Sequence, residues 1–441
     1  MLTLSQQTKL WKNWAGNVQS RPQQVALPES VEDVVSIVND CRRTGKHIRV
    51  VGSGHSFSRL VQTDDCLLSL ERLQGVYAVD SDQHTVEVWA GTNLKDLGQL
   101  LYEHGYSQEN LGDINAQSIA GAVSTGTHGT GIRFGSISTQ VVGMTVVTAA
   151  GEVLECSEGQ QPDLFRALQV SLGLLGILVR IRLRVVPTYR LRYRSVRMPL
   201  NECLASLDAF REDHRHFEFY AFPYSNTAQV KFMDETTELT NVNQTWSYVK
   251  KMVMENAVFW LLSESCRLIP SLCKPVSRLS AQAVPTVDES GYSHRLFATP
   301  RLVRFYEMEY SVPAEKMKDV VEELLQAIEQ DQFAVHFPIE CRYVKQDDIW
   351  LSPAHGRDSA FIAVHMYKGM QHQPYFERME SIFQRHGGRP HWGKMHTMKS
   401  DQLHLVLPHL ADFLALRSQL DPDGLFVNPF LSELFGISPR R

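Results

Sequence analysis

Two glycine-rich stretches carry residue types that could hold an anionic ligand against the backbone. The first is Val51-Gly-Ser-Gly-His55-Ser-Phe-Ser58, which follows the apolar run 47–51. Glycine allows positive φ and lets backbone N–H groups approach a ligand, and consecutive N–H groups in a turn form an anion-binding nest. Alone, this octapeptide fits equally well with a tight turn that exposes a histidine.

The second stretch spans residues 110–131 and interleaves glycines with hydroxyl residues around His128. It lacks the Gly-Lys-Ser/Thr ending of a Walker A loop and the nearby acid of a Rossmann fingerprint. Two such stretches in one part of the chain indicate a long, phosphate-bearing ligand that lies along the backbone.

The C-terminal half adds polar residues at strand spacing. Glu340 and Arg342 are two residues apart on a predicted strand, as are His365 and Tyr367 on another, so each pair projects from one face. The residues between and beside them are mostly apolar and point the other way. This pattern predicts a polar cavity wall, although a solvated sheet face with a weak Glu–Arg surface pair would look the same.

Joined to the motifs Trp350-Leu-Ser-Pro, Gly356-Arg-Asp-Ser and Arg389-Pro-His-Trp-Gly-Lys394, these stretches resemble a known family. The glycine stretches are similar to the FAD-binding domain of the vanillyl-alcohol-oxidase type. Within that group, nearly the whole chain resembles the sugar-1,4-lactone oxidases (gulonolactone and arabinonolactone) and the related alditol oxidases.

The resemblance implies an α+β flavoenzyme with two domains. Residues 1–188 would form an FAD-binding domain of the PCMH type. Residues 189–427 would form a substrate-binding cap domain, with an antiparallel sheet flanked by helices. Residues 428–441 would form a tail that returns to the FAD domain.

The resemblance also implies FAD as cofactor, joined covalently through His55 to the flavin 8α-methyl carbon. The cofactor contacts it implies lie in both glycine stretches, at the start of the strand 177–186, in the His-Trp-Gly-Lys motif and in the tail. They are Val51, Gly52, Ser53, Gly54, His55, Ser56, Gly112, Asp113, Ser118, Gly121, Ala122, Thr125, Gly126, His128, Gly129, Ile177, Lys394 and Asn428.

Further roles follow from the same resemblance. Glu340 and Arg342 would lie over the flavin ring, with Lys394 at its N1–C2=O edge, as the catalytic residues. Ser118, His365, Tyr367 and His396 would contact the substrate. The alternatives are a helix-capping role for Ser118, a solvated charge for Lys394 and a surface position for His396.

The implied reaction oxidises a sugar-acid 1,4-lactone by hydride transfer to flavin N5, with oxygen as acceptor and hydrogen peroxide as product. Gly112 matches the position where a small residue admits oxygen in the family, although a glycine there could equally serve a turn. The alternatives are a lactone dehydrogenase that uses a quinone or cytochrome, an alditol oxidase acting on xylitol or sorbitol, and a flavin-binding protein without catalysis.

Composition limits the other possibilities. The chain has 441 residues, a formal net charge of −5 and no basic patch, which argues against a nucleic-acid partner. The start lacks the pattern of a signal peptide, and the most apolar segment, 257–262, is too short to span a bilayer. The seven cysteines are scattered without a Cys-x-x-Cys motif, which favours the reducing cytoplasm and buried thiols. No second ligand stands at metal-site spacing from His128, so no metal site is predicted.

Hydrophobic periodicity predicts the elements that must position these residues. A capping box at 30–33 starts a helix that ends at Gly45, and Asn93 starts one that ends at His104. Strands are expected at 67–70, 85–90, 141–148, 152–156 and 177–186, and a helix at 163–172. Later strands are expected at 217–222, 305–311, 335–344 and 360–367, with helices near 201–213, 244–268, 313–330, 373–385 and 408–419.

Overall fold

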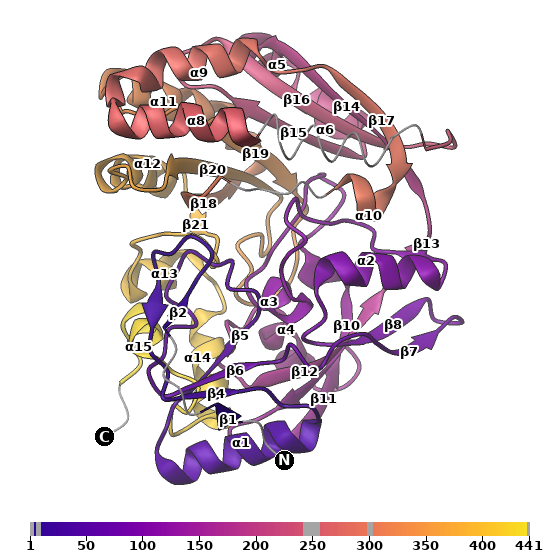
Figure 1. Cartoon of the computed structure of the whole chain (residues 1–441). Helices are drawn as coiled ribbons and strands as arrows, with labels where there is room; N and C mark the ends of the chain where they lie inside the picture. The colour runs from indigo at the N-terminus through magenta and orange to yellow at the C-terminus, as the bar shows by residue number, and fades with distance from the viewer. Residues whose placement is uncertain (1–3, 6–9, 241–255, 298–302, 439–441) are drawn as a thin grey trace.

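The computed structural model describes residues 4–5, 10–240, 256–297 and 303–438. Figure 1 shows two lobes, which we call the lower and the upper lobe after their places in that view. The strands up to β13 lie in the lower lobe, and the strands from β14 to β21 form one sheet in the upper lobe. None of the described helices has the length and apolarity needed to cross a membrane.

The lower lobe contains a four-stranded and a five-stranded sheet. In the first, β4 and β5 pair in parallel with β6, and in the second all neighbours are antiparallel in the order β11-β10-β12-β8-β7. The elements are β1 (Leu4–Ser5), β2 (Trp11–Lys12), β3 (Gln19–Ser20), β4 (Gln24–Ala26), α1 (Val31–Thr44), β5 (Ile48–Val51), β6 (Cys66–Ser69), β7 (Val76–Asp80), β8 (Thr85–Trp89), α2 (Leu94–Glu103), β9 (Tyr106–Ser107), α3 (Ile119–Ser124), η1 (Ile137–Gln140), β10 (Val141–Val147), β11 (Val153–Ser157), α4 (Pro162–Leu168), β12 (Ile177–Arg184) and β13 (Val186–Pro187).

The helix that leads into the first glycine stretch forms as its sequence predicts. The Ser30 side chain accepts a hydrogen bond from the Asp33 N–H at 3.1 Å, and Gly45 ends α1 with a φ of +71°. The face of α1 that carries Val34 and Val38 is buried. The parallel strand β5 then delivers the chain to Gly52.

The upper lobe is built on an eight-stranded antiparallel sheet in the order β17-β14-β16-β15-β19-β20-β18-β21. The remaining elements of the chain are β14 (Arg190–Pro199), α5 (Leu200–Ala205), α6 (Leu207–Asp213), β15 (His216–Ala221), β16 (Thr227–Glu235), α8 (Asn256–Leu268), η3 (Pro270–Leu272), α9 (Cys273–Gln282), β17 (Val287–Tyr292), α10 (Ser293–Leu296), β18 (Phe305–Pro313), η4 (Ala314–Lys316), α11 (Met317–Gln330), β19 (Ile339–Val344), β20 (Ser359–Tyr367), α12 (Gln373–Arg385), β21 (Arg389–Pro390), α13 (Ser400–Val406), α14 (Leu410–Leu420) and α15 (Pro429–Phe435).

One face of this sheet is apolar and packs against helices. The ring of Phe217 on β15 packs against that of Phe210 on α6 with centroids 5.4 Å apart, and Ile362 on β20 belongs to the same core as Val320 of α11. Because successive strand residues point to opposite faces, Glu218, Glu340 and His365 project from the other face. The eight-stranded sheet therefore separates an apolar core from a polar wall.

Several predicted elements differ in the structure. The helix predicted at 201–213 is broken at Ser206 into α5 and α6, and the one predicted at 163–172 ends at Leu168. The strand predicted at 335–344 begins only at Ile339, directly after Pro338, which has no N–H to donate. Residues 244–255 of a predicted helix lie outside the described residues, and α8 covers the rest. The strands β14, β16 and β17 were not predicted.

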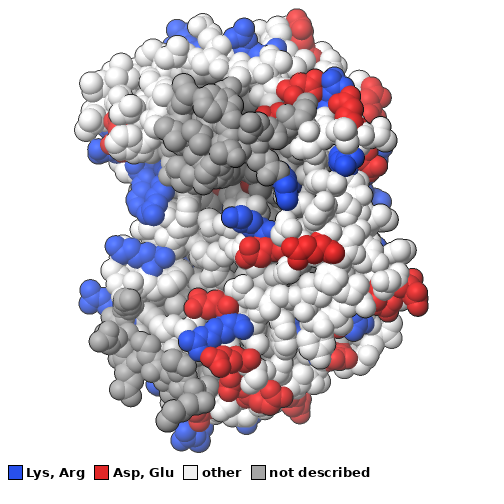
Figure 2. Space-filling model, turned by 45° about the vertical axis from the view of Figure 1, so that its right-hand side comes forward, with Lys and Arg blue, Asp and Glu red and all other residues white. Residues whose placement is uncertain are grey.

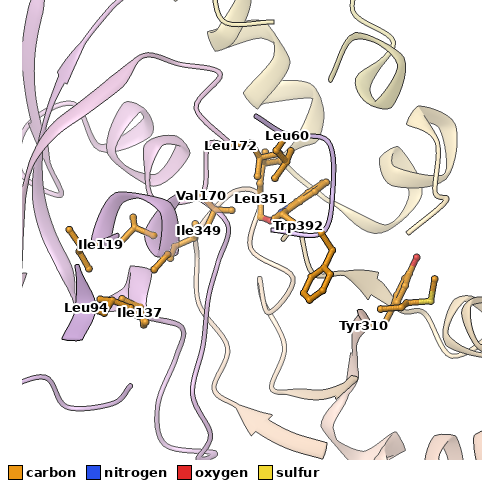
Figure 3. Packing of buried hydrophobic residues seen from close by; sticks show 14 of the residues in the cluster. Leu60, Leu94, Ile119, Ile137, Val170, Leu172, Tyr310, Ile349, Leu351 and Trp392 are labelled. Carbon is orange, nitrogen blue, oxygen red and sulfur yellow. The ribbon is translucent and has the colours of Figure 1, made fainter. Parts of the chain in front are cut away.

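The C-terminal segment lies in the lower lobe. Figure 1 shows α13, α14 and α15 beside the strands β4 to β6, and the Asn428 side chain donates to the carbonyl oxygens of Arg59, Leu60 and Gln62. Figure 3 shows Trp392 beside Leu60, Leu172 and Leu351. The predicted boundaries at 188 and 427 stay predictions.

Arg49 on β5 fastens these segments together. Its buried guanidinium donates to the carbonyl oxygens of Leu60 at 2.7 Å, Leu172 at 2.6 Å and Phe426 at 2.5 Å. Burial lowers the pKa of Arg49 to about 10, although nearby Asp421 raises it. One side chain thus satisfies carbonyl groups from three distant parts of the chain.

We expect Arg49→Met to lower the free energy of unfolding by about 3 kcal/mol or more, because it leaves buried carbonyl groups without donors. Chemical denaturation would measure the change. Arg43→Met is the matched control, since Arg43 is exposed at the end of α1 and its loss should cost at most about 0.5 kcal/mol. Equal effects of the two substitutions would contradict a fastening role for Arg49.

Candidate active site

The two glycine stretches meet at Gly52 and Ser118. A Cβ atom at Gly52 would lie 2.2 Å from the Ser118 Oγ atom, so only glycine fits there. The same Oγ accepts a hydrogen bond from the Gly121 N–H at 3.3 Å and caps α3. The capping interpretation of Ser118 is thus present in the structure, and a substrate contact stays a prediction.

Hydrogen bonds to its carbonyl oxygens hold the first glycine stretch in place. Gly54 accepts a hydrogen bond from the Trp14 N–H at 2.8 Å, and Ser56 accepts one from the Asn13 side chain at 2.9 Å. Within the described part of the chain, no atom accepts a hydrogen bond from the backbone N–H groups of residues 53–56. Four consecutive N–H groups with no protein acceptor form a nest that suits a pyrophosphate. The residues present therefore fit a dinucleotide such as FAD.

The C-terminal half supports this nest from the other side. The Phe57 N–H donates to the Gly393 carbonyl oxygen at 2.7 Å, and the Ser58 hydroxyl donates to that of Trp392 at 2.9 Å. His55 stacks on Trp14 with ring centroids 5.7 Å apart. Burial lowers the pKa of His55, and the positive charge of Lys394 lowers it further. Both effects favour the neutral imidazole of His55 near pH 7.

The second stretch is packed tightly against itself. A Cβ atom at Gly129 would lie 2.2 Å from the Leu111 carbonyl oxygen, and Gly126 has a φ of +69°. The Thr125 hydroxyl donates to the Gly121 carbonyl oxygen at 2.9 Å. Gly112 has no left-handed φ, but a Cβ atom there would lie 3.0 Å from the His128 carbonyl oxygen. A side chain at Gly112 is therefore disfavoured by a close approach rather than by turn geometry.

Arg342 on β19 joins the polar wall of the upper lobe to this stretch. Its Nη2 atom lies 2.7 Å from the Asp113 Oδ2 atom and also pairs with Glu340, while its Nε atom donates to the Glu218 Oε2 atom at 2.8 Å. All three carboxylates are within reach of one guanidinium. Burial lowers the pKa of Arg342, but Asp113, Glu340 and Glu218 outweigh it, so the pKa lies well above its usual value.

Two further groups complete this network. The Tyr220 hydroxyl donates to the Glu340 Oε1 atom at 2.6 Å, and the Lys231 ammonium donates to the Glu218 Oε1 atom at 2.8 Å. Burial and the two carboxylates raise the pKa of Tyr220 well above its usual value. Tyr220 thus stays protonated and acts as a hydrogen-bond donor.

A second charged group lies beside the first on β18 and β20. The Lys394 Nζ atom lies 2.6 Å from the Glu307 Oε1 atom and 3.8 Å from the Glu309 Oε2 atom. The His365 Nε2 atom lies 3.5 Å from Glu307 and 3.7 Å from the Glu340 Oε2 atom. Burial raises the pKa of Glu307, but Lys394 and His365 together more than offset it, so the pKa falls to about 2.

His128 of the second glycine stretch also reaches this group. Its Nε2 atom lies 3.2 Å from the Glu309 Oε1 atom, and His391 lies close to both. Sequence spacing gave no sign of these neighbours, because they come from β18 and from the turn after β21. Lys394 supplies a cation to the same carboxylate, which accounts for the charge of Glu309 without a metal ion.

The structure places the remaining predicted residues further from this network. The Tyr367 hydroxyl donates to the Glu264 side chain of α8, and both ring nitrogens of His396 lack hydrogen-bond partners among the described residues. Burial lowers the pKa of His396 to about 4. Ile177 is fully buried at the start of β12, and Asn428 bonds to protein backbone.

Several members of the network were not identified from the sequence. They are Tyr220, Glu218, Lys231, Glu307, Glu309 and His391. The sequence did contain a signal for four of them. Glu218 and Tyr220 occupy every second position of the run 217–222, between phenylalanines and Ala221. Glu307 and Glu309 likewise occupy every second position of the run 305–311, on either side of Met308. A polar residue at every second position of a strand marks a polar face.

The sequence pattern of the family described as D-arabinono-1,4-lactone oxidase matches residues 181–434, and that of an FAD binding domain matches residues 22–157. The L-gulono-1,4-lactone dehydrogenase of Mycobacterium tuberculosis is 36% identical over 97% of this chain and 99% of its own length. The L-gulonolactone oxidase of Bos taurus is 32% identical over 96% of this chain and 98% of its own length.

The fold has relatives among solved structures. The cholesterol oxidase of B. sterolicum superposes with a TM-score of 0.84, at 18% identity, over 98% of this chain and 97% of its own. At that identity the likeness concerns the fold alone. It agrees with the predicted α+β architecture, in which an FAD-binding domain is joined to an antiparallel sheet flanked by helices. By its matched sequence pattern and its full-length relatives, the chain belongs to the D-arabinono-1,4-lactone oxidase family and binds FAD.

Proposed function

We propose that the protein oxidises a secondary alcohol of a sugar-acid 1,4-lactone of the L-gulono or D-arabinono class. Bound FAD would accept the hydride of the carbinol carbon, the hydroxyl proton would leave to the protein, and oxygen would take up the two electrons to give hydrogen peroxide. The names of the full-length relatives support the substrate class.

One observation carries the proposal: a wall of charged and hydroxyl side chains faces a backbone nest built for a pyrophosphate. The Asp113–Arg342 ion pair of 2.7 Å joins the wall to the second glycine stretch, which meets the first one at Gly52 and Ser118. Such an arrangement would bring a polar substrate and a dinucleotide together, so that the reaction would take place between the lobes. A protein that only stores flavin would not need this wall.

When bound, FAD supplies the hydride acceptor, and the side chains of the wall supply orientation and charge. Arg342 and Lys394 are the proposed partners of the substrate oxygens and of the negative charge that develops during transfer. The Glu340 and His365 pair, 3.7 Å apart, is the proposed acceptor of the hydroxyl proton. Ser118 lies where the two glycine stretches meet and is the proposed contact from the lower lobe.

The match of Gly112 to the position where a small residue admits oxygen in the family is the reason for proposing oxygen as the acceptor. Its neighbours are the His128 carbonyl oxygen and the Thr127 side chain, at 3.0 and 3.6 Å from an added Cβ atom. A methyl group would therefore fill the space beside this segment. The dehydrogenase named among the relatives makes a quinone or cytochrome acceptor the competing possibility.

A steady-state screen tests the function. Gulonolactone, arabinonolactone, galactonolactone, xylitol and sorbitol would each be offered with oxygen or with a quinone analogue. We expect a 1,4-lactone with oxygen to give the highest kcat/KM and to release hydrogen peroxide. The open-chain acid of each lactone is the control, since its negative charge is repelled by the carboxylates of the wall.

Other results would identify the alternatives. Faster turnover of xylitol or sorbitol would indicate an alditol oxidase. Slow reaction of the reduced enzyme with air but fast reaction with the quinone would indicate a dehydrogenase. If oxygen reacts quickly, Gly112→Ala should slow re-oxidation without changing the rate of reduction, provided that the variant has the wild-type melting temperature.

We also propose that His55 is bonded covalently to the flavin, because its imidazole is neutral and it lies within the nest. After acid precipitation, the wild-type pellet should stay yellow, whereas His55→Ala should release all its flavin to the supernatant. His47→Ala is a matched control, since His47 lies on the same segment but pairs with Asp65. A colourless wild-type pellet would refute the covalent bond.

Lys394→Met should slow flavin reduction by about 10²–10³-fold and change substrate affinity much less, because the cation stabilises charge that appears during transfer. Stopped-flow reduction under anaerobic conditions separates the two effects. Lys399→Met, at an exposed position five residues further on, should behave as wild type. Equal reduction rates in the two variants would exclude a catalytic role for Lys394.

A further inference from the structure

Three side chains of types that bind metal ions, two cysteines and a histidine, lie close together in the upper lobe. Cys266 lies on α8, Cys273 begins α9, and His336 lies in the turn before β19. All three are buried, and their ligand atoms lie within 4.8 Å of one another. Both thiols are free, so the two cysteines are not joined by a disulfide.

The orientation of His336 suits a ligand. Its Nε2 atom lies 2.9 Å from the Ser263 Oγ atom, which leaves the lone pair of Nδ1 facing Cys273 when Nε2 carries the proton. Metal-binding histidines are held in the same way, by a hydrogen bond to the second ring nitrogen. Ser263 and Cys266 both lie on α8, so one helix provides a ligand and its support.

The spacing also matches a shared ion. The His336 Nδ1 atom lies 3.9 Å from the Cys273 Sγ atom, which is long for a direct hydrogen bond. With Zn–S and Zn–N bonds of about 2.3 and 2.0 Å, two ligands of one zinc ion stand roughly 3.6–3.8 Å apart. The observed separation therefore needs to shrink only slightly to accept an ion.

Charge and surroundings favour the same conclusion. Two thiolates and a neutral imidazole balance the charge of Zn²⁺, so the complex carries no net charge into the interior. The rings of Phe259 and Phe337 lie 5.9 and 4.9 Å from the His336 ring and border the cluster, and a water molecule would supply the fourth ligand of a tetrahedral zinc ion. Two buried cysteines beside a histidine are also the ligand types that zinc prefers.

We propose that Cys266, Cys273 and His336 bind a zinc ion. The ion fastens α8 to α9 and to the turn before β19. Because Glu264 of α8 bonds to the Tyr367 hydroxyl on β20, the site also supports one end of the polar wall. Its role is structural, since no residue of the charged network belongs to it.

The metal content of the untagged wild-type protein, produced with zinc in the medium, tests the proposal directly. Inductively coupled plasma mass spectrometry should find about one zinc ion per chain. After exchange for Co²⁺, the protein should show the d–d bands of a tetrahedral site with thiolate ligands, in the red, where oxidised flavin does not absorb. Less than about a tenth of an ion per chain and no cobalt bands would overturn the site.

Variants assign the ligands. Cys273→Ser and His336→Gln should each lose most of the zinc, whereas Cys203→Ser should keep it, since Cys203 is an equally buried cysteine on α5. Undiminished zinc in both ligand variants would overturn the assignment, as would a Cys266–Cys273 disulfide in the mass spectrum of the wild type. The wild-type zinc and cobalt measurements decide the matter if a variant does not fold.

Discussion

The structure depends on one buried cation, the guanidinium of Arg342. A buried charge is costly unless it is paired, and Arg342 is paired with Asp113, Glu218 and Glu340. These carboxylates come from a loop of the lower lobe and from two strands of the upper lobe. Removing any of them would leave a buried N–H group of the guanidinium without its acceptor, so all three segments must be in place around Arg342.

That requirement fixes the register of the eight-stranded sheet. Glu218 stands opposite Arg342, and Tyr220 stands opposite Glu340, across β15 and β19. A slip of one residue would turn Glu340 and Arg342 toward the helices that cover the apolar face. The charged network and the apolar core thus select the same alignment, each from its own side of the sheet.

The sequence alone predicts the faces of strands but not their neighbours. Alternation was enough to place Glu340 and Arg342 on one face, and the capping box at 30–33 and Gly45 predicted the two ends of α1, as the structure confirms. It could not show that Asp113 would meet Arg342, because that contact joins residues far apart in the chain. The same holds for Gly52 against Ser118 and for the cysteines beside His336. Short breaks, such as Ser206 between α5 and α6, depend on packing rather than on periodicity.

The face of the molecule in Figure 2 shows no charged patch that would indicate the kind of partner. Figure 2 shows lysine and arginine interspersed with aspartate and glutamate on one face, without a large patch of either sign. This face therefore offers no strong field for long-range attraction of a charged partner.

The balance of charge in that wall bears on which form of a sugar acid it accepts. Five carboxylates, those of Asp113, Glu218, Glu307, Glu309 and Glu340, stand against three cations among the described residues, Lys231, Arg342 and Lys394. A free sugar acid would add another negative charge to a group that already has an excess. A 1,4-lactone is the cyclic ester of the same acid, formed by loss of water; it carries no charge, and its hydroxyl groups can donate hydrogen bonds to the carboxylates of the wall. The electrostatics of the wall thus favour the lactone over the acid from which it forms, independently of any particular sugar stereochemistry.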